Sequence, residues 1–282
     1  MKKLAIGFLF AVSAFAVDPG LLKLAMPEAR ILAGIDVAKV RETPFGKFAL
    51  AQFSAAQDPQ YDAFAKASGF DLGASLDEIL LVKTEGGDRW LALGRGRFDA
   101  TRILDAASAA GAGVGTYQGA RVLIGSDVWL AFLDGSIVAM GDPASVRDAV
   151  ERREKGAGPA AEIASRANVV SKAYALWFIS SAPIGDLLEE LPSAGAGQAL
   201  KSGALSSVHG VSGGVNFGDR VTLSAELTAG SAQDASNLAA LLKFVAGSVA
   251  QGPADVASDG SVVRLGLALT EAQLEALWKK GE

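Results

Sequence analysis

The chain has 282 residues, half of them hydrophobic and one fifth charged, so it is long enough for one large or two ordinary domains and too apolar to be disordered. Its net charge of −5 argues against nucleic acid or an anionic membrane surface as the main partner, because both attract basic surfaces. The absence of cysteine excludes disulfides, thiolate nucleophiles, cysteine-bound metals and a lipid-bearing cysteine.

Residues 1–16 have the features of a secretion signal. Met1–Lys3 is basic, Leu4–Phe15 is apolar but short for a membrane span, and Ala14–Ala16 fits a small-x-small cleavage site. An uncleaved anchor or a buried N-terminal helix is the alternative. We expect cleavage near Ala16, before Val17, and a periplasmic or secreted protein. Removal of these 16 residues would leave 266, with a net charge of −7 after the loss of two lysines. No later apolar run is long enough to span a membrane.

The first predicted α+β unit, residues 17–153, alternates strands with capped helices. Turn, cap and periodicity signals predict, in order, a strand at 29–35, a helix from Thr43-Pro44, a helix from Asp58-Pro59 ended by Gly69, strands at 77–84 and 89–97, and a helix from Asp99 to Ala109. The segment Ile79–Val82 is apolar on both faces, which favours a central strand covered on both sides. We expect the other unit or a ligand to cover one of them.

The stretch Arg121–Arg153 ends this unit as strand, turn, strand, turn, strand and capped helix. An Asp134-Gly135 pair separates the apolar runs Trp129–Leu133 and Ser136–Met140, which predicts a hairpin with a type I′ turn. Asp142-Pro143 then predicts the start of a helix, because Asp caps free N–H groups and Pro suits the first helical position.

A predicted linker at residues 154–168, broken near Gly156–Pro159, separates the first unit from a second at 169–282. The second unit is expected to begin with a strand at 174–180, a helix from Ala182-Pro183 and a hairpin of strands at 206–217 and 220–228. A helix capped by Ser231 and Asp234 and a hairpin at 254–269 around Asp259-Gly260 follow. The last helix is expected to be capped by Thr270 and Gln273 and to carry Leu274, Leu277 and Trp278.

Both units follow the order strand, helical segment, hairpin, helix, hairpin, helix. A fixed order of this kind suggests an internal duplication, although any antiparallel α+β protein alternates in a similar way. The predicted fold class is therefore α+β: two tandem, duplicated units, each a twisted antiparallel sheet with helices mainly on one face.

His209 and Ser212 are the candidates for nucleophilic catalysis. The segment Gly210–Gly214 matches the G-x-S-x-G pattern, but a nucleophile elbow needs a helix after the serine, and Val215–Phe217 continues as a strand. His209, the only histidine, also precedes the serine, against the α/β-hydrolase order. We interpret the glycines as a bend in a strand and the histidine as a strand residue with one hydrogen-bond partner.

Other motifs have structural explanations. The glycine loop Gly111–Gly115 lacks phosphate-loop spacing and precedes a strand. The acidic group Asp71, Asp77 and Glu78 lacks the pattern of a calcium loop, and the adjacent Glu189-Glu190 do not face each other on a helix. The remaining candidates are Arg89, Arg95 and Arg97, as a cationic rim for an acidic ligand or a charged strand edge, and the strand residues Trp90, Trp129 and Trp177, expected in the core.

The sequence therefore nominates no catalytic residue, metal ligand or cofactor, and assigns no ligand-binding residue. The leading hypothesis is an exported bacterial envelope protein with a non-enzymatic binding or scaffolding role. A sharper version of it is the carriage of an apolar ligand between sheet and helices, although a normal core also explains the apolar strand and the alanine-rich helices. Its partner would be an unknown envelope protein or a small apolar ligand. The alternatives are a hydrolase of unknown substrate, using Ser212 with His209 or carboxylates, and an inhibitor or assembly partner recognised through a sheet edge.

Overall fold

The computed structural model describes residues 17–55, 59–86, 89–156, 158–183, 205–250, 254–270 and 272–273. The strands are β1 (Ile31–Asp36), β2 (Leu76–Lys83), β3 (Trp90–Gly96), β4 (Gly113–Tyr117), β5 (Ala120–Ile124), β6 (Trp129–Phe132), β7 (Ile137–Gly141), β8 (Leu176–Ser180), β9 (Val208–Phe217), β10 (Val221–Ala229), β11 (Asp255–Asp259) and β12 (Val262–Leu269). The helices are α1 (Pro19–Leu24), α2 (Val37–Val40), α3 (Pro44–Ala55), α4 (Pro59–Ser68), α5 (Leu72–Ser75), α6 (Ala100–Ala109), α7 (Pro143–Lys155), α8 (Ala161–Ala173) and α11 (Ala232–Ala250).

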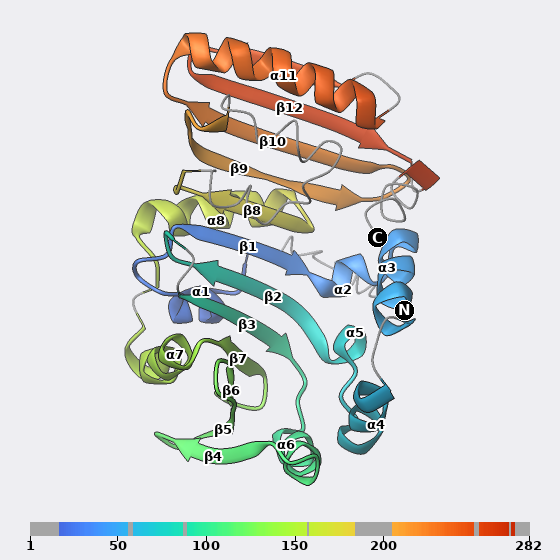
Figure 1. Cartoon of the computed structure of the whole chain (residues 1–282), viewed down its shortest axis with the longest axis vertical. Helices are drawn as coiled ribbons and strands as arrows, with labels where there is room; N and C mark the ends of the chain where they lie inside the picture. The colour runs from blue at the N-terminus through green and yellow to red at the C-terminus, as the bar shows by residue number, and fades with distance from the viewer. Residues whose placement is uncertain are drawn as a thin grey trace, which may run out of the picture.

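The strands form one antiparallel sheet in the order β11-β12-β10-β9-β8-β1-β2-β3-β7-β6-β5-β4 (Figure 1). The mixed α+β class and the antiparallel pairing are confirmed. The two sheets predicted for the two units are instead one sheet, because β1 pairs with β8 along its length. β8 carries no charge or proline, and β1 carries one charge, Asp36, at its last position, so neither strand has a central residue that protects a sheet edge.

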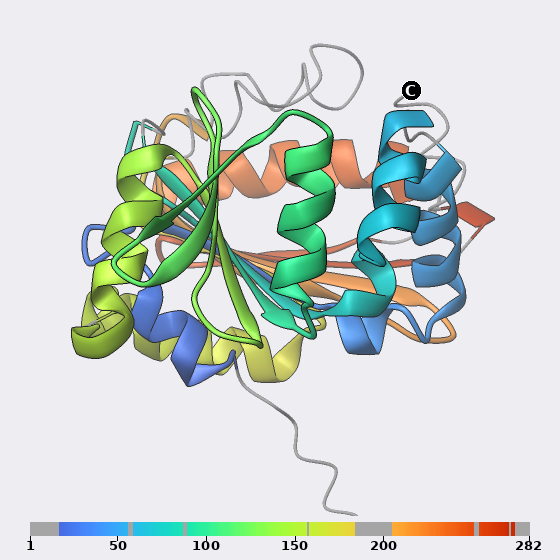
Figure 2. The ribbon, with the colours of Figure 1, turned by 90° about the horizontal axis from the view of Figure 1, so that it is seen from below.

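Helices lie on both faces of this sheet, so the expectation of helices mainly on one face is wrong. Figure 2 shows α6 and α11 on one side, here called the front face, and α1 and α8 on the other, the back face. The main core lies at the back, where Leu80, Leu93 and Val146 are fully buried among residues of α1, α7 and α8. A smaller core under α11 packs at the front of the second half.

Local signals located several helices accurately. The Asp99 carboxylate accepts a hydrogen bond from Arg102 N at 3.0 Å and starts α6 at Ala100. Ser231 and Asp234 form the predicted capping box before α11, with Asp234 N donating to Ser231 Oγ at 3.1 Å. A short polar side chain satisfies the free N–H groups of a helix start wherever it occurs, so these positions can be read from sequence.

The Asp134-Gly135 hairpin is confirmed, but its predicted type I′ turn is wrong. Gly135 lacks the positive φ that such a turn requires, and the Asp134 carboxylate instead accepts hydrogen bonds from Ser136 N at 2.6 Å and Ile137 N at 2.7 Å. Gln118 and Gly119 have φ of 43° and 79° and close the tight β4–β5 turn. The loop predicted at 111–115 is therefore partly strand, because β4 begins at Gly113.

Some helices lie where the sequence indicated none, among them α8 and α1. Helix α8 occupies residues 161–173 and so covers most of the predicted linker, and α1 begins directly after Asp18, whose carboxylate caps it. The helix predicted from Ala182-Pro183 falls mainly on residues 184–204, and the last predicted helix mainly on residues 274–282. Both lie outside the described residues.

Replacing Asp142 by Ala is expected to lower the free energy of unfolding by about 1–2 kcal/mol. Asp142 caps α7 by accepting from Ser145 N at 2.9 Å, and ties that helix to β3 by accepting from Trp90 N at 3.0 Å. Burial alone would raise the pKa of Asp142, but these donors and Arg89 hold it below its usual value.

The contribution of Asp142 is present above the pKa of Asp in the unfolded chain and is lost as the pH falls through the lower pKa of the folded protein. Urea unfolding of the parent and of Asp142→Ala at about pH 7 and about pH 2 checks this. The difference between them should shrink in acid, and an equal difference at both values would contradict the role of the ionised cap.

Candidate functional site

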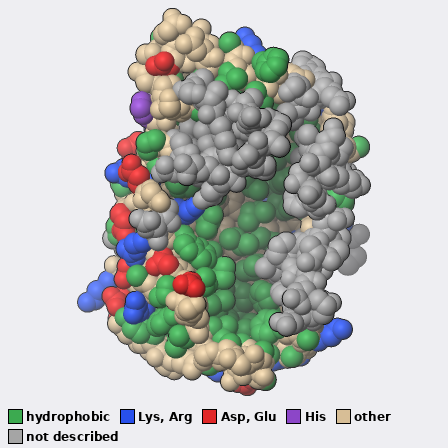
Figure 3. Space-filling view, viewed as in Figure 1, with side chains coloured by type: hydrophobic (Ala, Val, Ile, Leu, Met, Phe, Trp, Pro, Cys, Tyr) green, Lys and Arg blue, Asp and Glu red, His purple; other side chains and the backbone are tan. Residues whose placement is uncertain are grey.

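A cavity of about 260 Å³ opens on the front face between α4, α6 and the strands of the first half. All of its lining residues are apolar or glycine: Phe64, Phe70, Leu76, Ile79, Ala92, Leu93, Gly94, Phe98, Ile103, Leu123, Leu130, Phe132, Val138 and Met140. We call this cavity the apolar pocket. Figure 3 shows this face hollowed, with hydrophobic side chains gathered in the hollow.

Strand alternation positions the floor of the apolar pocket. Leu80 and Val82 of β2 point to the back core and are fully buried, whereas Ile79 points to the front and is half-buried. The doubly apolar strand predicted from sequence is therefore present. Its back face is covered by the chain itself, while its front face lines a cavity.

A row of apolar residues crosses the front face by direct cross-strand pairing. It runs through Phe178, Ala33, Leu81, Ala92, Met140, Leu130 and Leu123. These side chains are partly accessible, and Met140 is 39% exposed. In the corresponding back row of Ile179, Leu32, Val82 and Leu91, no side chain is more than 3% exposed. The two faces are equally apolar but unequally covered.

Small residues keep the floor low and aromatic rings form the rim. At Gly94 a Cβ would lie 2.8 Å from Leu76 Cδ2, so glycine lets that side chain pack close to the backbone. The ring of Phe98 lies 6.5 Å from that of Phe70 and 6.2 Å from that of Phe132, measured between centroids. Such a concave hydrocarbon surface binds hydrocarbon groups.

The wall of the apolar pocket is fastened by Arg102 of α6. Its Nε donates to Ala67 O at 2.9 Å and its Nη2 to Lys66 O at 3.3 Å, which joins α6 to the end of α4. Gly69, with φ of 69°, turns the chain beneath the Arg102 guanidinium. These contacts are exposed at the surface, so the wall is held by polar bonds outside the apolar interior.

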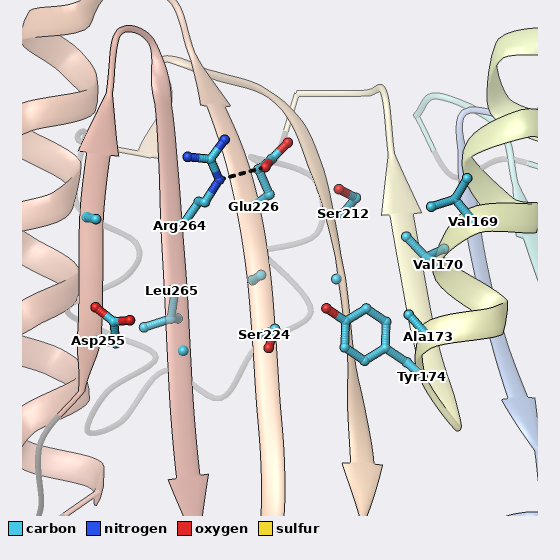
Figure 4. A pocket seen from close by; sticks show the side chains of 14 residues that line it. Val169, Val170, Ala173, Tyr174, Ser212, Ser224, Glu226, Asp255, Arg264 and Leu265 are labelled. Carbon is cyan, nitrogen blue, oxygen red and sulfur yellow. Dashed lines mark hydrogen bonds and ion pairs between the residues drawn. The ribbon is translucent and has the colours of Figure 1, made fainter.

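A larger hollow of about 500 Å³ lies on the back face between α8 and strands β9, β10, β12 and β11. Figure 4 shows Tyr174 over β9 and the pair in which Arg264 Nε donates to Glu226 Oε2 at 3.2 Å. Both charged side chains are about half exposed or more. Because its polar groups are already solvated and spread along several strands, we regard the apolar pocket as the better site.

Ser212 lines this back hollow, whereas His209 is exposed and is not among the residues that line it. Gly210–Gly214 lies inside the continuous strand β9, so the segment forms no nucleophile elbow. The structure therefore does not bring the two candidate catalytic residues together in this hollow.

Arg95 lies in β3, with Arg89 and Arg97 directly before and after the strand; carboxylates pair with Arg89 and Arg95, and β3 is not an edge strand. It pairs with β2 and β7, while Arg89 is bound by Glu28, at 2.7 Å, and by Asp148, and Arg95 by Asp18 and Glu78. Of the tryptophans, Trp177 is a core residue, and Trp129 packs partly buried against the core beside the guanidinium of Arg147. Trp90 is half-buried on β3.

Asp71, Asp77 and Glu78 have structural partners, whereas Glu189-Glu190 lie outside the described residues. Asp71 accepts from Ala74 N at 2.7 Å at the start of α5, and Asp77 pairs with Arg41 at 2.7 Å. Burial raises the pKa of Glu78, against the opposing effects of Asp18 N and Arg95. In the described part of the chain, no group of three or more His, Asp or Glu residues is placed to hold a metal ion. No described helix is long and apolar enough to cross a membrane.

Comparison with solved structures finds the same fold in TP0453. Crystal forms I, III and IV of TP0453 align with TM-scores of 0.60, 0.64 and 0.60 at 10%, 11% and 9% sequence identity. Each alignment covers 94% of this chain and 97–99% of the other. At this identity the likeness establishes the fold alone. No protein-family model and no curated protein matches the chain.

Proposed function

We propose that this protein is an exported bacterial envelope protein without enzymatic activity, which carries an apolar ligand in the apolar pocket. The observation that supports the proposal best is a concave site of about 260 Å³ lined only by apolar residues and glycine. Because no polar side chain lines the site to orient a reactant, we expect the site to bind a ligand without catalysing a reaction. The features of residues 1–16 favour export, and the net charge of −5 argues against an anionic surface as partner.

A hydrocarbon chain is the class of ligand that suits this pocket. Each buried CH₂ contributes about 0.8 kcal/mol, and micromolar binding corresponds to about −8 kcal/mol, so about ten buried methylenes are needed before the cost of immobilising the chain and about 15 once at least about 4 kcal/mol is added for it. The partly accessible row from Phe178 to Leu123 gives a longer chain a path beyond the cavity.

Filling the apolar pocket tests the proposal. Ala92 is half-buried at the floor, so Ala92→Trp is expected to occupy the cavity and to lower affinity for cis-parinaric acid, a fluorescent fatty acid, by at least about tenfold. The matched control is Ala257→Trp on the exposed back face of edge strand β11, which should leave the affinity unchanged. Parent protein that fails to bind the probe, or equal affinities in both variants, would contradict ligand carriage.

We also infer that the two halves are repeats of one ancestral unit. From the centre outward the sheet reads β1-β2-β3-β7-β6 on one side and β8-β9-β10-β12-β11 on the other. In each series the chain visits the first three strands in order, then reaches the next two in reverse. A front-face helix, α6 or α11, follows the third strand in both (Figure 2). The antiparallel β1–β8 pair at the centre suits a two-fold relation between the halves, with the β4–β5 hairpin as an addition.

Assembly through a sheet edge stays a second hypothesis. Strand β4 is one edge of the sheet, and its Val114 is 39% exposed. An exposed apolar edge strand offers unpaired backbone groups to another chain. Sedimentation of the parent and of Val114→Lys would test it, with a loss of self-association or partner binding in the variant as the supporting result.

A further inference from the structure

Val17, the residue expected to begin the processed chain, is buried at the back of the molecule. It is 2% exposed and belongs to the main core cluster. Its nitrogen donates to the hydroxyl oxygen of Ser171 at 2.9 Å, and Ser171 on α8 is 5% exposed. The start of an exported chain is ordinarily solvated and loosely held, so this position requires an explanation.

A cavity of about 230 Å³ lies beside Val17. Val17 lines it together with Ser171, with the carboxylates of Asp36, Asp77 and Glu78, and with Arg95. The next nitrogen along the chain, that of Asp18, donates to Glu78 Oε1 at 3.0 Å. Consecutive Cα atoms are roughly 3.8 Å apart. Val17 N is therefore one residue along the chain from the nitrogen that donates to this carboxylate.

In the described part of the chain, the carboxylates around this cavity outnumber their cations by one: Asp18, Asp36, Asp77 and Glu78 pair with Lys39, Arg41 and Arg95. Among the described residues, Lys39 pairs with Asp36 at 2.9 Å and Arg41 with Asp77 at 2.7 Å. Arg95 alone serves both Asp18, at 3.3 Å, and Glu78, at 3.5 Å. The side chain of Glu78 is 14% exposed, and its burial raises the pKa of its carboxyl group. A buried carboxylate that shares its only cation is stabilised by a further positive charge.

We propose that this cavity is a binding site for the free α-ammonium group of Val17, with Ser171 as its hydrogen-bond acceptor and Glu78 as its ionic partner. The inference rests on the proposed export. A signal-removing peptidase would hydrolyse the Ala16–Val17 bond with one water, leaving a carboxylate on Ala16 and an ammonium on Val17. That ammonium has three donors where the peptide had one. One keeps the Ser171 contact, and the others reach the carboxylates in the cavity.

The test compares two purified proteins, one beginning at Val17 and one retaining Ala16 before it. Both keep a free amine, but only the first places it against Glu78. The chain that begins at Val17 is expected to have an unfolding equilibrium constant in urea that is smaller on the order of tenfold. This stabilisation lies between that of an exposed ion pair and the cost of breaking a buried one. Equal stability would overturn the proposal.

Glu78→Gln shows whether the difference comes from the charge of Glu78 or only from the space that the retained Ala16 takes up. In this background the difference between the two N-termini should disappear, whereas the exposed Glu85→Gln on the turn after β2 should leave it intact. A difference that persists in Glu78→Gln would overturn the assignment. If Glu78→Gln does not fold, the rate of reductive methylation of the Val17 amine decides, because the native parent should be protected relative to Ser171→Ala. Equal rates would overturn the proposal.

The intact mass of protein recovered from its own envelope distinguishes this inference from the function on which it rests. An unprocessed mass would contradict export together with the inference. A mass that begins at Val17, with no stability difference between the two N-termini, would contradict the inference alone. Binding of cis-parinaric acid by the same samples reports separately on the apolar pocket.

Discussion

Replacing Trp177 by Ala is expected to lower the free energy of unfolding by about 3–5 kcal/mol, the largest effect we predict for a single truncation. Trp177 of β8 is 3% exposed in the back core, and its indole ring lies on the backbone of Gly34 in β1. These are the two strands through which the halves of the sheet are joined. Truncation would therefore leave a cavity at the junction of the halves. Urea unfolding of parent and variant measures the loss, with half-buried Trp90→Ala as the control of smaller effect.

Gly34→Ala shows whether the ring on the glycine is the cause. A Cβ at Gly34 would lie 2.4 Å from Trp177 Cε2, so the methyl group and the ring cannot both keep their places. Gly34→Ala should destabilise the parent strongly and do little harm in the Trp177→Ala background, where the space is open. Additive losses in the double variant would contradict this packing.

The elements that the sequence predicted well depend on neighbouring residues. Asp99, Asp142 and Ser231 each cap the helix that follows, and the cap needs no information from elsewhere in the chain. The hairpins were found for the same reason, although the turn type at Asp134-Gly135 was wrong because the Asp134 carboxylate bonds to the chain two and three residues on.

The joining of the halves and the apolar pocket depend on contacts between distant residues. No local signal shows that β1 would pair with β8. Gly34 and Gly214 are required because the rings of Trp177 and Tyr174 occupy the space that a Cβ at these positions would need. The apolar pocket had one signal, the strand Ile79–Val82 with two apolar faces. Its rim of Phe64, Phe70 and Phe98 comes from segments whose proximity only the fold establishes.

Two neighbouring substitutions in β2 should have opposite consequences, because Leu80 and Ile79 face opposite sides of the sheet. Leu80 is fully buried in the back core, so Leu80→Asn is expected to cost more than about 3 kcal/mol through a lost side chain and a buried amide without partners. Ile79 is half-buried on the floor of the apolar pocket, so Ile79→Asn should cost less than about 1.5 kcal/mol and lower affinity for cis-parinaric acid at least about tenfold.

Urea unfolding and probe binding on the same two variants separate packing from function. A substitution in apolar surface that serves only the core should weaken probe binding in proportion to the stability that the protein loses. A substitution in surface that binds a ligand should weaken probe binding while the protein keeps its stability. Ile79→Asn therefore carries the test. If it unfolds the protein as severely as Leu80→Asn does, the front face is a core face like the back. If it leaves both stability and binding intact, the ligand lies elsewhere. Lost binding in a stable Ile79→Asn variant would mean that the chain keeps one face of its central strand uncovered for a hydrocarbon guest.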